Sequence, residues 1–230
     1  MIDFNEFLDA QGKIYQKFRD NSEIVLEQGV KPDPFMNKAG YLILLKHGDD
    51  ITEPVSRFSE RIGREVPALL YRSDTLHTTF SNYAVTDLVQ GQEFNVDKGL
   101  ENKLLSAVGR VVNQRDSQLE ITYPDWLYNQ TTVIVQGEAT QGFLTLAERI
   151  QSEGLNEGVV LSLPWGAHIT SARFLQSRRP EEIADFFKLM QEAPALGVSR
   201  PQHLEIGYFT LSPQNFNYQT IERFTLQKAA

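Results

Sequence analysis

The histidines of this 230-residue chain follow a pattern that could support acid–base chemistry. Two of the four occur in His-x-Thr triplets, His77-Thr78-Thr79 and His168-Ile169-Thr170. Successive side chains alternate between the two faces of a strand, so a His and a Thr two positions apart project from the same face. Each triplet therefore offers an imidazole and a hydroxyl side by side.

Two such strands facing one another would enclose two imidazoles and two hydroxyls, which suits a phosphodiester. One imidazole would take a proton from the attacking oxygen and the other would give one to the leaving oxygen, since a histidine pKa of about 6.5 makes both forms available near neutral pH. The hydroxyls of Thr79 and Thr170 could donate hydrogen bonds to the phosphoryl oxygens. This chemistry needs no metal or other cofactor. We interpret His47 and His203 as structural or surface residues.

A weak internal repeat supports a paired site. When residues 69–83 are set beside 160–174 without gaps, the two His-x-Thr triplets coincide. Each copy reads as an apolar strand, a short turn and a second strand that begins at the His. The same alignment sets Asn82 against Arg173.

Both triplets resemble the signature of the two-histidine (2H) phosphoesterase superfamily, which includes bacterial RNA 2′,3′-cyclic phosphodiesterases once described as 2′-5′ RNA ligases. Residues 76–80 match the first signature motif, and 167–174 match the second with the Ala-Arg that often ends it. Residues 204–212 and 218–226 resemble the last two strands of the family. The resemblance covers about residues 40–227.

The resemblance implies an α+β, bilobal fold in which two antiparallel sheets line a central cleft and helices lie outside. The His-x-Thr pairs would face this cleft. We divide the chain into an N-terminal helical extension and linker, residues 1–36, and a two-lobed 2H phosphoesterase-like domain, residues 37–230.

Three further residues are candidate substrate contacts. The family uses the position of Arg173 to touch substrate, but strand parity points this side chain away from the cleft that His168 faces. A bulge or the end of the strand would have to turn it inward, and the alternative is a surface ion pair. Tyr83 and Trp165 could stack on a nucleobase, which is worth about 1–3 kcal/mol per base. The alternative for both is packing in the core.

The composition limits the partners. With 22 Lys and Arg against 30 Asp and Glu, the net charge of −8 argues against a grip on long nucleic acid, yet allows a small anionic ligand. The lack of cysteine excludes disulfides, cysteinyl metal sites and thiol nucleophiles. No run of 18 apolar residues is present, and the acidic first residues lack the apolar core of a signal peptide. We expect a cytoplasmic protein without a membrane partner. The sequence does not indicate whether it is a monomer or an oligomer.

The periodicity of apolar residues predicts a mixture of helices and hairpin-connected strands. A Pro-containing linker is expected over 29–40. Helices are predicted over 3–19, 52–66, 100–112, 143–154 and 180–190. Strands are predicted over 41–46, 67–72, 75–83, 119–127, 131–138, 158–163, 167–174, 204–211 and 218–227.

Together these features predict a metal-independent cyclic phosphodiesterase that acts on a small nucleotide or RNA end, with a 2′,3′-cyclic phosphate as the expected substrate. His77 and His168 would be catalytic, and Thr79 and Thr170 would bind phosphate. Two alternatives stay open: a non-catalytic module that holds a nucleotide or other phosphorylated ligand in the same cleft, and a phosphodiesterase for a non-RNA substrate. The sequence does not distinguish the acid from the base.

Overall fold

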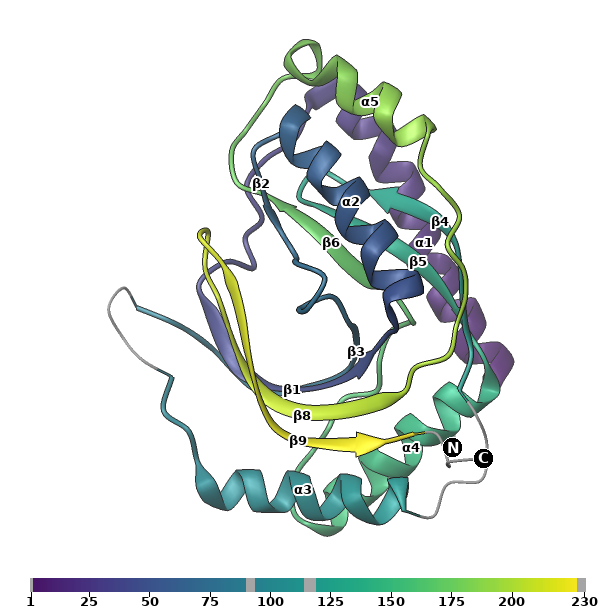
Figure 1. Cartoon of the computed structure of the whole chain (residues 1–230), viewed down its shortest axis with the longest axis vertical. Helices are drawn as coiled ribbons and strands as arrows, with labels where there is room; N and C mark the ends of the chain where they lie inside the picture. The colour runs from purple at the N-terminus through teal and green to yellow at the C-terminus, as the bar shows by residue number, and fades with distance from the viewer. Residues whose placement is uncertain (1, 90–93, 114–118, 227–230) are drawn as a thin grey trace.

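The chain folds into one strongly curled antiparallel sheet with helices against it, as a computed structural model that describes residues 2–89, 94–113 and 119–226 shows (Figure 1). The helices are α1 (Phe4–Gln28), α2 (Asp49–Glu65), α3 (Lys98–Val112), α4 (Gln141–Asn156), the short 3-10 helix η1 (Pro180–Ile183) and α5 (Ala184–Gln191). The strands are β1 (Lys38–Lys46), β2 (Ala68–Leu70), β3 (Thr78–Asp87), β4 (Ile121–Tyr128), β5 (Thr132–Ala139), β6 (Ile169–Phe174), β7 (Gly197–Ser199), β8 (His203–Leu211) and β9 (Phe216–Thr225).

The sheet has two halves that meet at its centre. Its strand order is β7-β4-β5-β6-β3-β1-β8-β9, with β2 paired to β6. We call β3-β1-β8-β9 the first lobe and β7-β4-β5-β6 with β2 the second lobe. The halves are joined by one residue pair, Thr78 with Ile169. The two expected sheets are therefore the two halves of one curled sheet, and each His-x-Thr triplet lies where its half meets the other.

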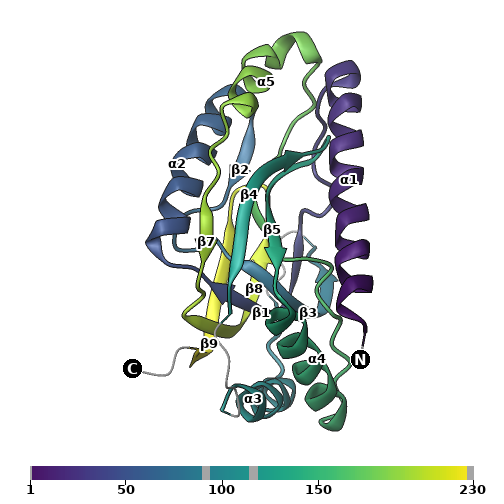
Figure 2. The ribbon, with the colours of Figure 1, turned by 90° about the vertical axis from the view of Figure 1, so that its right-hand side faces the viewer.

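Helices cover both faces of the second lobe (Figure 2). Tyr15 and Phe18 of α1 pack with Leu127 of β4. Phe58 of α2 packs on the neighbouring residue Trp126, with 4.6 Å between ring centroids. Because adjacent residues of a strand point to opposite faces, α1 and α2 cover opposite faces of this half-sheet.

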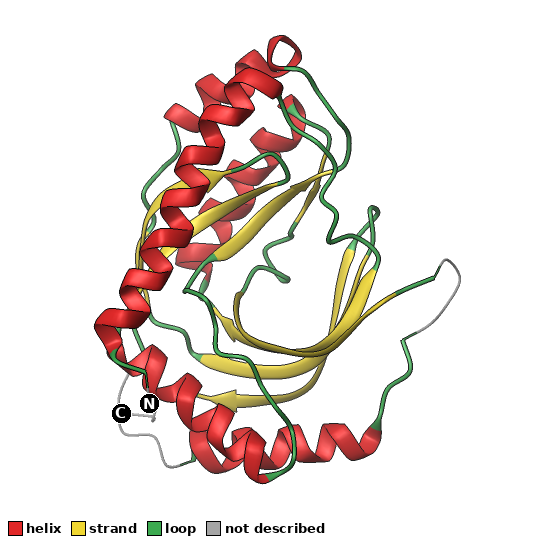
Figure 3. Cartoon of the chain, turned by 180° about the vertical axis from the view of Figure 1, so that it is seen from behind, coloured by secondary structure: helices red, strands yellow, loops and turns green. Residues whose placement is uncertain are grey.

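The helices α3 and α4 pack against each other at the other end of the molecule, beneath the first lobe (Figure 3). Gly109 of α3 lies close to Phe224 of β9, because a Cβ at this glycine would be 3.4 Å from the Phe224 ring. The first lobe thus has helices on its outer face, as the resemblance implies.

The first helix is longer than its predicted span and is joined tightly to the body. Asp3 caps its N-terminus by accepting hydrogen bonds from the backbone N–H groups of Asn5 and Glu6. It ends at Gly29, whose φ of 75° favours glycine. A Cβ at Gly29 would lie 1.9 Å from the Arg178 carbonyl oxygen, so the chain leaving α1 runs directly along the end of the second lobe.

Residues 158–163 do not form the strand that their apolar content predicts. Both edges of β6 are already occupied, by β5 on one side and by β2 and β3 on the other, so no edge is left to pair with. Val159 and Leu161 are instead buried beside α4, while Val160 is 73% exposed. The segment becomes an extended connection to the second triplet.

Smaller differences concern element ends. The helix predicted to start at Thr52 starts at Asp49, and the sequence did not predict the three-residue β7. Position 227, the end of the last predicted strand, lies outside the described residues. Among the described residues, no helix is long and apolar enough to span a membrane.

Candidate active site

A cavity of about 420 Å³ lies where the two lobes meet, and both His-x-Thr triplets open into it. Its lining includes residues from the inner ends of β3 and β6, from the linker after α1, and from the connection before β6. Of the residues named from the sequence, six line the cavity: His77, Thr79, His168, Thr170, Arg173 and Trp165. The antiparallel pairing of Thr78 with Ile169 places His77 next to Thr170 and Thr79 next to His168.

The middle residue of each triplet points away from the cavity, as strand alternation predicts. Ile169 is fully buried in the core. Thr78 Oγ1 lies 2.6 Å from the Tyr123 hydroxyl and 3.1 Å from His47 Nε2. His47 Nδ1 in turn lies 2.7 Å from Ser199 Oγ. This buried network ties the first triplet to β4 and β7 of the second lobe.

A β-bulge follows each triplet at the same distance. In β3, Thr79 pairs with Leu44 and Ser81 pairs with Ile43, which leaves Phe80 as an extra residue. In β6, Thr170 pairs with Ile134 and Ala172 pairs with Val133, which leaves Ser171. Both extra residues stand three positions after the motif histidine. The internal repeat is therefore a repeat of structure, bulges included.

The bulges decide which later side chains face the cavity. An extra residue reverses the alternation beyond it, so Arg173 lines the cavity although simple parity points it away. The same reversal brings Asn82 to the cavity and leaves Tyr83 outside the lining. Tyr83 is half-buried opposite Tyr41 in β1. In the sequence, the signal for Asn82 is its alignment with Arg173 in the internal repeat.

Burial keeps both histidines neutral at pH 7. His77 Nδ1 donates to the Thr75 carbonyl at 2.7 Å, which leaves Nε2 as an acceptor. Burial lowers the pKa of His77 to about 4; the Thr75 carbonyl opposes this shift, and the charges of Lys46 and Arg173 add to it. Burial also lowers the pKa of His168 to about 3, with further lowering by the His77 and Arg173 charges.

The N-terminal helix supports the second triplet. Trp165 stacks on the His168 ring with 3.9 Å between centroids, and Tyr15 of α1 meets Trp165 edge-on at 5.7 Å. The Gln11 side-chain oxygen accepts a hydrogen bond from the Ala167 N–H at 3.2 Å. From the sequence, Tyr15 and Gln11 lie in the helix predicted over 3–19, and that prediction does not distinguish a core helix from a wall of the site.

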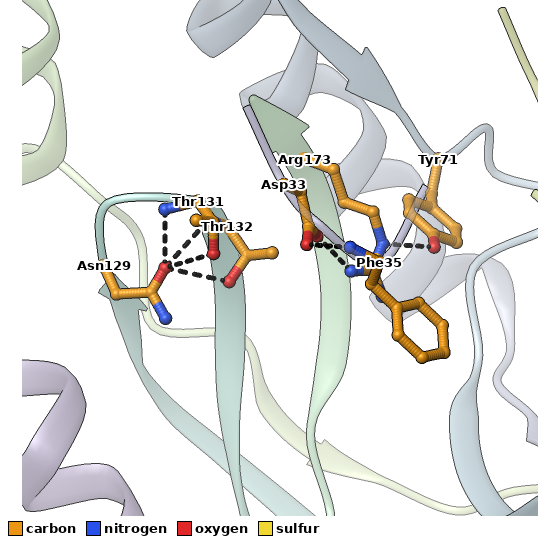
Figure 4. A network of polar contacts seen from close by, with 7 residues as sticks. All are labelled: Asp33, Phe35, Tyr71, Asn129, Thr131, Thr132 and Arg173. Carbon is orange, nitrogen blue, oxygen red and sulfur yellow. Dashed lines mark hydrogen bonds and ion pairs between the residues drawn. The ribbon is translucent and has the colours of Figure 1, made fainter. Parts of the chain in front are cut away.

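Arg173 is held by residues that the sequence did not single out (Figure 4). Its Nε donates to the Tyr71 hydroxyl at 2.9 Å, its guanidinium forms an ion pair with Asp33, and it lies over the Phe35 ring at 5.2 Å. The expected alternative, an ion pair, is present, but it is buried and faces the cavity. Asp33 and Phe35 belong to the Pro-containing linker, where nothing in the sequence distinguishes them from an exposed loop.

Solved structures share this fold, although no protein-family model and no curated protein matches the sequence. Escherichia coli LigT in apo form has a TM-score of 0.55 at 15% identity, over 84% of this chain and 99% of that chain. TT0787 of Thermus thermophilus has a TM-score of 0.55 at 14% identity, over 81% of this chain and 97% of that chain. The chain has the same fold as E. coli LigT.

The LigT-like fold explains why the site lies at the centre of the sheet. Each lobe contributes one motif strand, and the two strands touch at a single pair before they diverge, which opens the cavity between them. Within residues 2–89, 94–113 and 119–226, no group of three or more His, Asp or Glu side chains is placed to hold a metal ion.

The buried histidines of this LigT-like fold should make stability fall in acid. Burial lowers the pKa of His47 to about 3, as it lowers those of His77 and His168. In the unfolded chain each pKa returns to about 6.5, so between about pH 6.5 and 4 the unfolded state binds more protons. We expect the free energy of unfolding to be level above pH 6.5 and to decrease as the pH is lowered.

Urea unfolding at several pH values between 7.5 and 4.5 measures this dependence. Carboxylates also contribute in acid, so the variant His47→Gln is the informative comparison: it should show a shallower slope below pH 6.5 than the unmodified protein. Equal slopes in the two proteins would contradict the role of buried His47.

Proposed function

We propose that the protein is a phosphodiesterase that hydrolyses a small nucleotide or RNA-end phosphodiester, with a nucleoside 2′,3′-cyclic phosphate as the expected substrate. The observation that carries this proposal is the convergence of two imidazoles and two hydroxyls in one cavity of about 420 Å³. Structures of the same fold support it: E. coli LigT has been crystallised with 3′-AMP, with NADP+ and with ATP.

In the proposed reaction, water attacks phosphorus, its proton passes to one imidazole, and the phosphorus bond to a ribose oxygen breaks. That oxygen receives a proton from the other imidazole. The hydroxyls of Thr79 and Thr170 donate hydrogen bonds to the non-bridging phosphoryl oxygens. We propose that catalysis needs no metal, because proton transfer at both oxygens is supplied by the two histidines.

We assign the acid role to His77 and the base role to His168. The Thr75 carbonyl accepts the Nδ1 proton of His77, so it stabilises the charged form, and the negative charge of a bound phosphodiester would raise the pKa of His77 further. A charged His77 lowers the pKa of His168 and keeps this neighbour neutral, as a base must be.

Hydrolysis of the four nucleoside 2′,3′-cyclic monophosphates in the presence of EDTA tests the function. We expect turnover that EDTA does not remove and that gives one phosphomonoester isomer. A folded protein that hydrolyses none of the four would overturn the expected substrate. Activity that EDTA abolishes and added divalent metal restores would overturn the metal-independent mechanism.

The assignment of acid and base has its own test. An acid is needed only when the leaving group is a poor one, so a diester with a p-nitrophenolate leaving group should rescue His77→Ala but not His168→Ala. We expect the rate deficit of His77→Ala to shrink by at least about 10-fold on the activated ester, as its transition state needs little proton donation. The opposite pattern, rescue of His168→Ala alone, would reverse the two roles.

A further inference from the structure

The cavity contains a buried carboxylate next to its positive charge. Among the described residues that line it, Arg173 is the sole Lys or Arg and Asp33 is the sole Asp or Glu. The two form an ion pair in which the Arg173 side chain is 15% exposed and the Asp33 side chain is 5% exposed. The pair therefore adds no net charge to the lining.

Asp33 is built into this position by the local chain. Its Oδ1 accepts a hydrogen bond from the Phe35 N–H at 2.8 Å, and its Oδ2 accepts one from Arg173. Its own backbone N–H donates to the Phe174 carbonyl at 2.9 Å, next to Arg173 in β6. Since both carboxylate oxygens and the backbone are engaged, the carboxylate does not depend on solvent for its position.

The neighbours of Arg173 favour its charged state, and Asp33 balances its positive charge. Burial acts to lower the pKa of Arg173, but the Tyr71 hydroxyl and the Asp33 carboxylate outweigh this effect and raise it. Arg173 thus stays a cation whose charge is already balanced. A phosphate that enters the cavity meets a hydrogen-bond donor without a net positive charge.

The substrate and the product carry different charges, and the Arg173–Asp33 pair can discriminate between them. A phosphodiester carries one negative charge, whereas a phosphomonoester carries about 1.5 to 2 at pH 7. The second charge gains nothing from a neutralised arginine and is repelled by the carboxylate beside it. Beside the Arg173–Asp33 pair, the second negative charge of the monoester is therefore disfavoured.

We propose that Asp33 sets the charge selectivity of the cavity: by neutralising Arg173 it favours a phosphodiester monoanion and disfavours the phosphomonoester dianion that hydrolysis produces. This inference rests on the proposed function for its substrate and product. Its consequence is weak product inhibition, because hydrolysis adds a negative charge to the phosphate next to the Asp33 carboxylate.

The test is the ratio of the product inhibition constant to KM for a 2′,3′-cyclic nucleotide, measured for the full chain and for Asp33→Asn. Removal of the carboxylate frees the charge of Arg173, so we expect the ratio to fall by about 10-fold or more, through tighter binding of the monoester. Asp33→Ser, whose hydroxyl can still accept from the Phe35 N–H, should give the same fall if Asp33→Asn does not fold.

Three comparisons separate charge from structure. Asp33→Glu keeps the charge and should keep the ratio near that of the unmodified protein. Tyr71→Phe removes an uncharged partner of the same guanidinium, so the ratio should not fall. The double variant Asp33→Asn/Arg173→Gln should lose the tighter monoester binding. An unchanged ratio in folded Asp33→Asn and Asp33→Ser, or an equal fall in Tyr71→Phe, would overturn the inference.

Calorimetric titration with nucleoside 2′- and 3′-monophosphates separates this inference from the proposed function, because it needs no turnover. Tighter monoester binding by Asp33→Asn in a protein without diesterase activity would support the charge role and reject the proposed activity. Normal turnover with identical monoester affinities in the two proteins would reject the charge role alone.

Discussion

Replacement of either cavity histidine by alanine should lower kcat/KM for a 2′,3′-cyclic nucleotide by about 10²–10⁴-fold, the range that a positioned acid or base contributes. The reason is geometric as well as chemical: His77 and His168 directly precede β3 and β6, the strands that meet at the centre of the sheet, and both line one cavity. Steady-state kinetics on purified His77→Ala and His168→Ala, at the same pH and in EDTA, measures the loss.

His203→Gln is the matched control, because His203 starts β8 and does not line the cavity. It should retain the rate of the unmodified protein. A double variant His77→Ala/His168→Ala should lose little more than the worse single variant, because the two groups act in one proton-transfer step. Full activity in both single variants would reject the two-histidine mechanism.

Gly137→Ala should be the most damaging single methyl group that can be added near the site. A Cβ at Gly137 would lie 1.5 Å from the Ala167 carbonyl oxygen and 2.9 Å from the Tyr123 ring. The nearest atom belongs to the backbone, so no change of rotamer relieves the clash. We expect a loss of about 3 kcal/mol or more in the free energy of unfolding, at or above the usual cost of overpacking.

The same clash should also displace His168, because Ala167 directly precedes it in the chain. We expect the folded fraction of Gly137→Ala to lose activity as well, at least about 10-fold, as a misplaced catalytic group does. Urea unfolding and kinetics on the folded protein measure the two effects. Gly12→Ala is the control: beyond the chain neighbours and backbone of its own helix, nothing lies within 4 Å of its Cβ, and it should stabilise α1 by about 0.5–1 kcal/mol. Native stability and rate in Gly137→Ala would contradict this account.

Features that depend on one segment of the chain follow from the sequence more readily than contacts between segments far apart in it. The triplets, their placement at strand starts, and the α+β class follow from the His-x-Thr spacing and from apolar periodicity, and the structure confirms the fold. A period of two is a property of the strand itself, so the shared face of His77 and Thr79 needs no knowledge of their partners.

Features that depend on which strands pair are harder to predict from the sequence. The predicted strand at 158–163 has a suitable composition, but both edges of the adjacent β6 are occupied by other strands, and such pairing is decided by the whole sheet. The bulges at Phe80 and Ser171 are visible only when the registers with β1 and β5 are known. They decide that Arg173 lines the cavity and that Tyr83 does not.

The charge of the site shows most clearly which properties the sequence determines and which the tertiary structure decides. The identities of the two histidines and two threonines are local information, carried by a short motif that can be read along one chain segment. Their low pKa values arise from burial, and the pairing of Arg173 with Asp33 joins residues 140 positions apart. Burial and long-range charge pairing exist only after the chain has folded, so the chemistry available could be read from the residues, whereas its protonation state and charge selectivity depend on the packing around them.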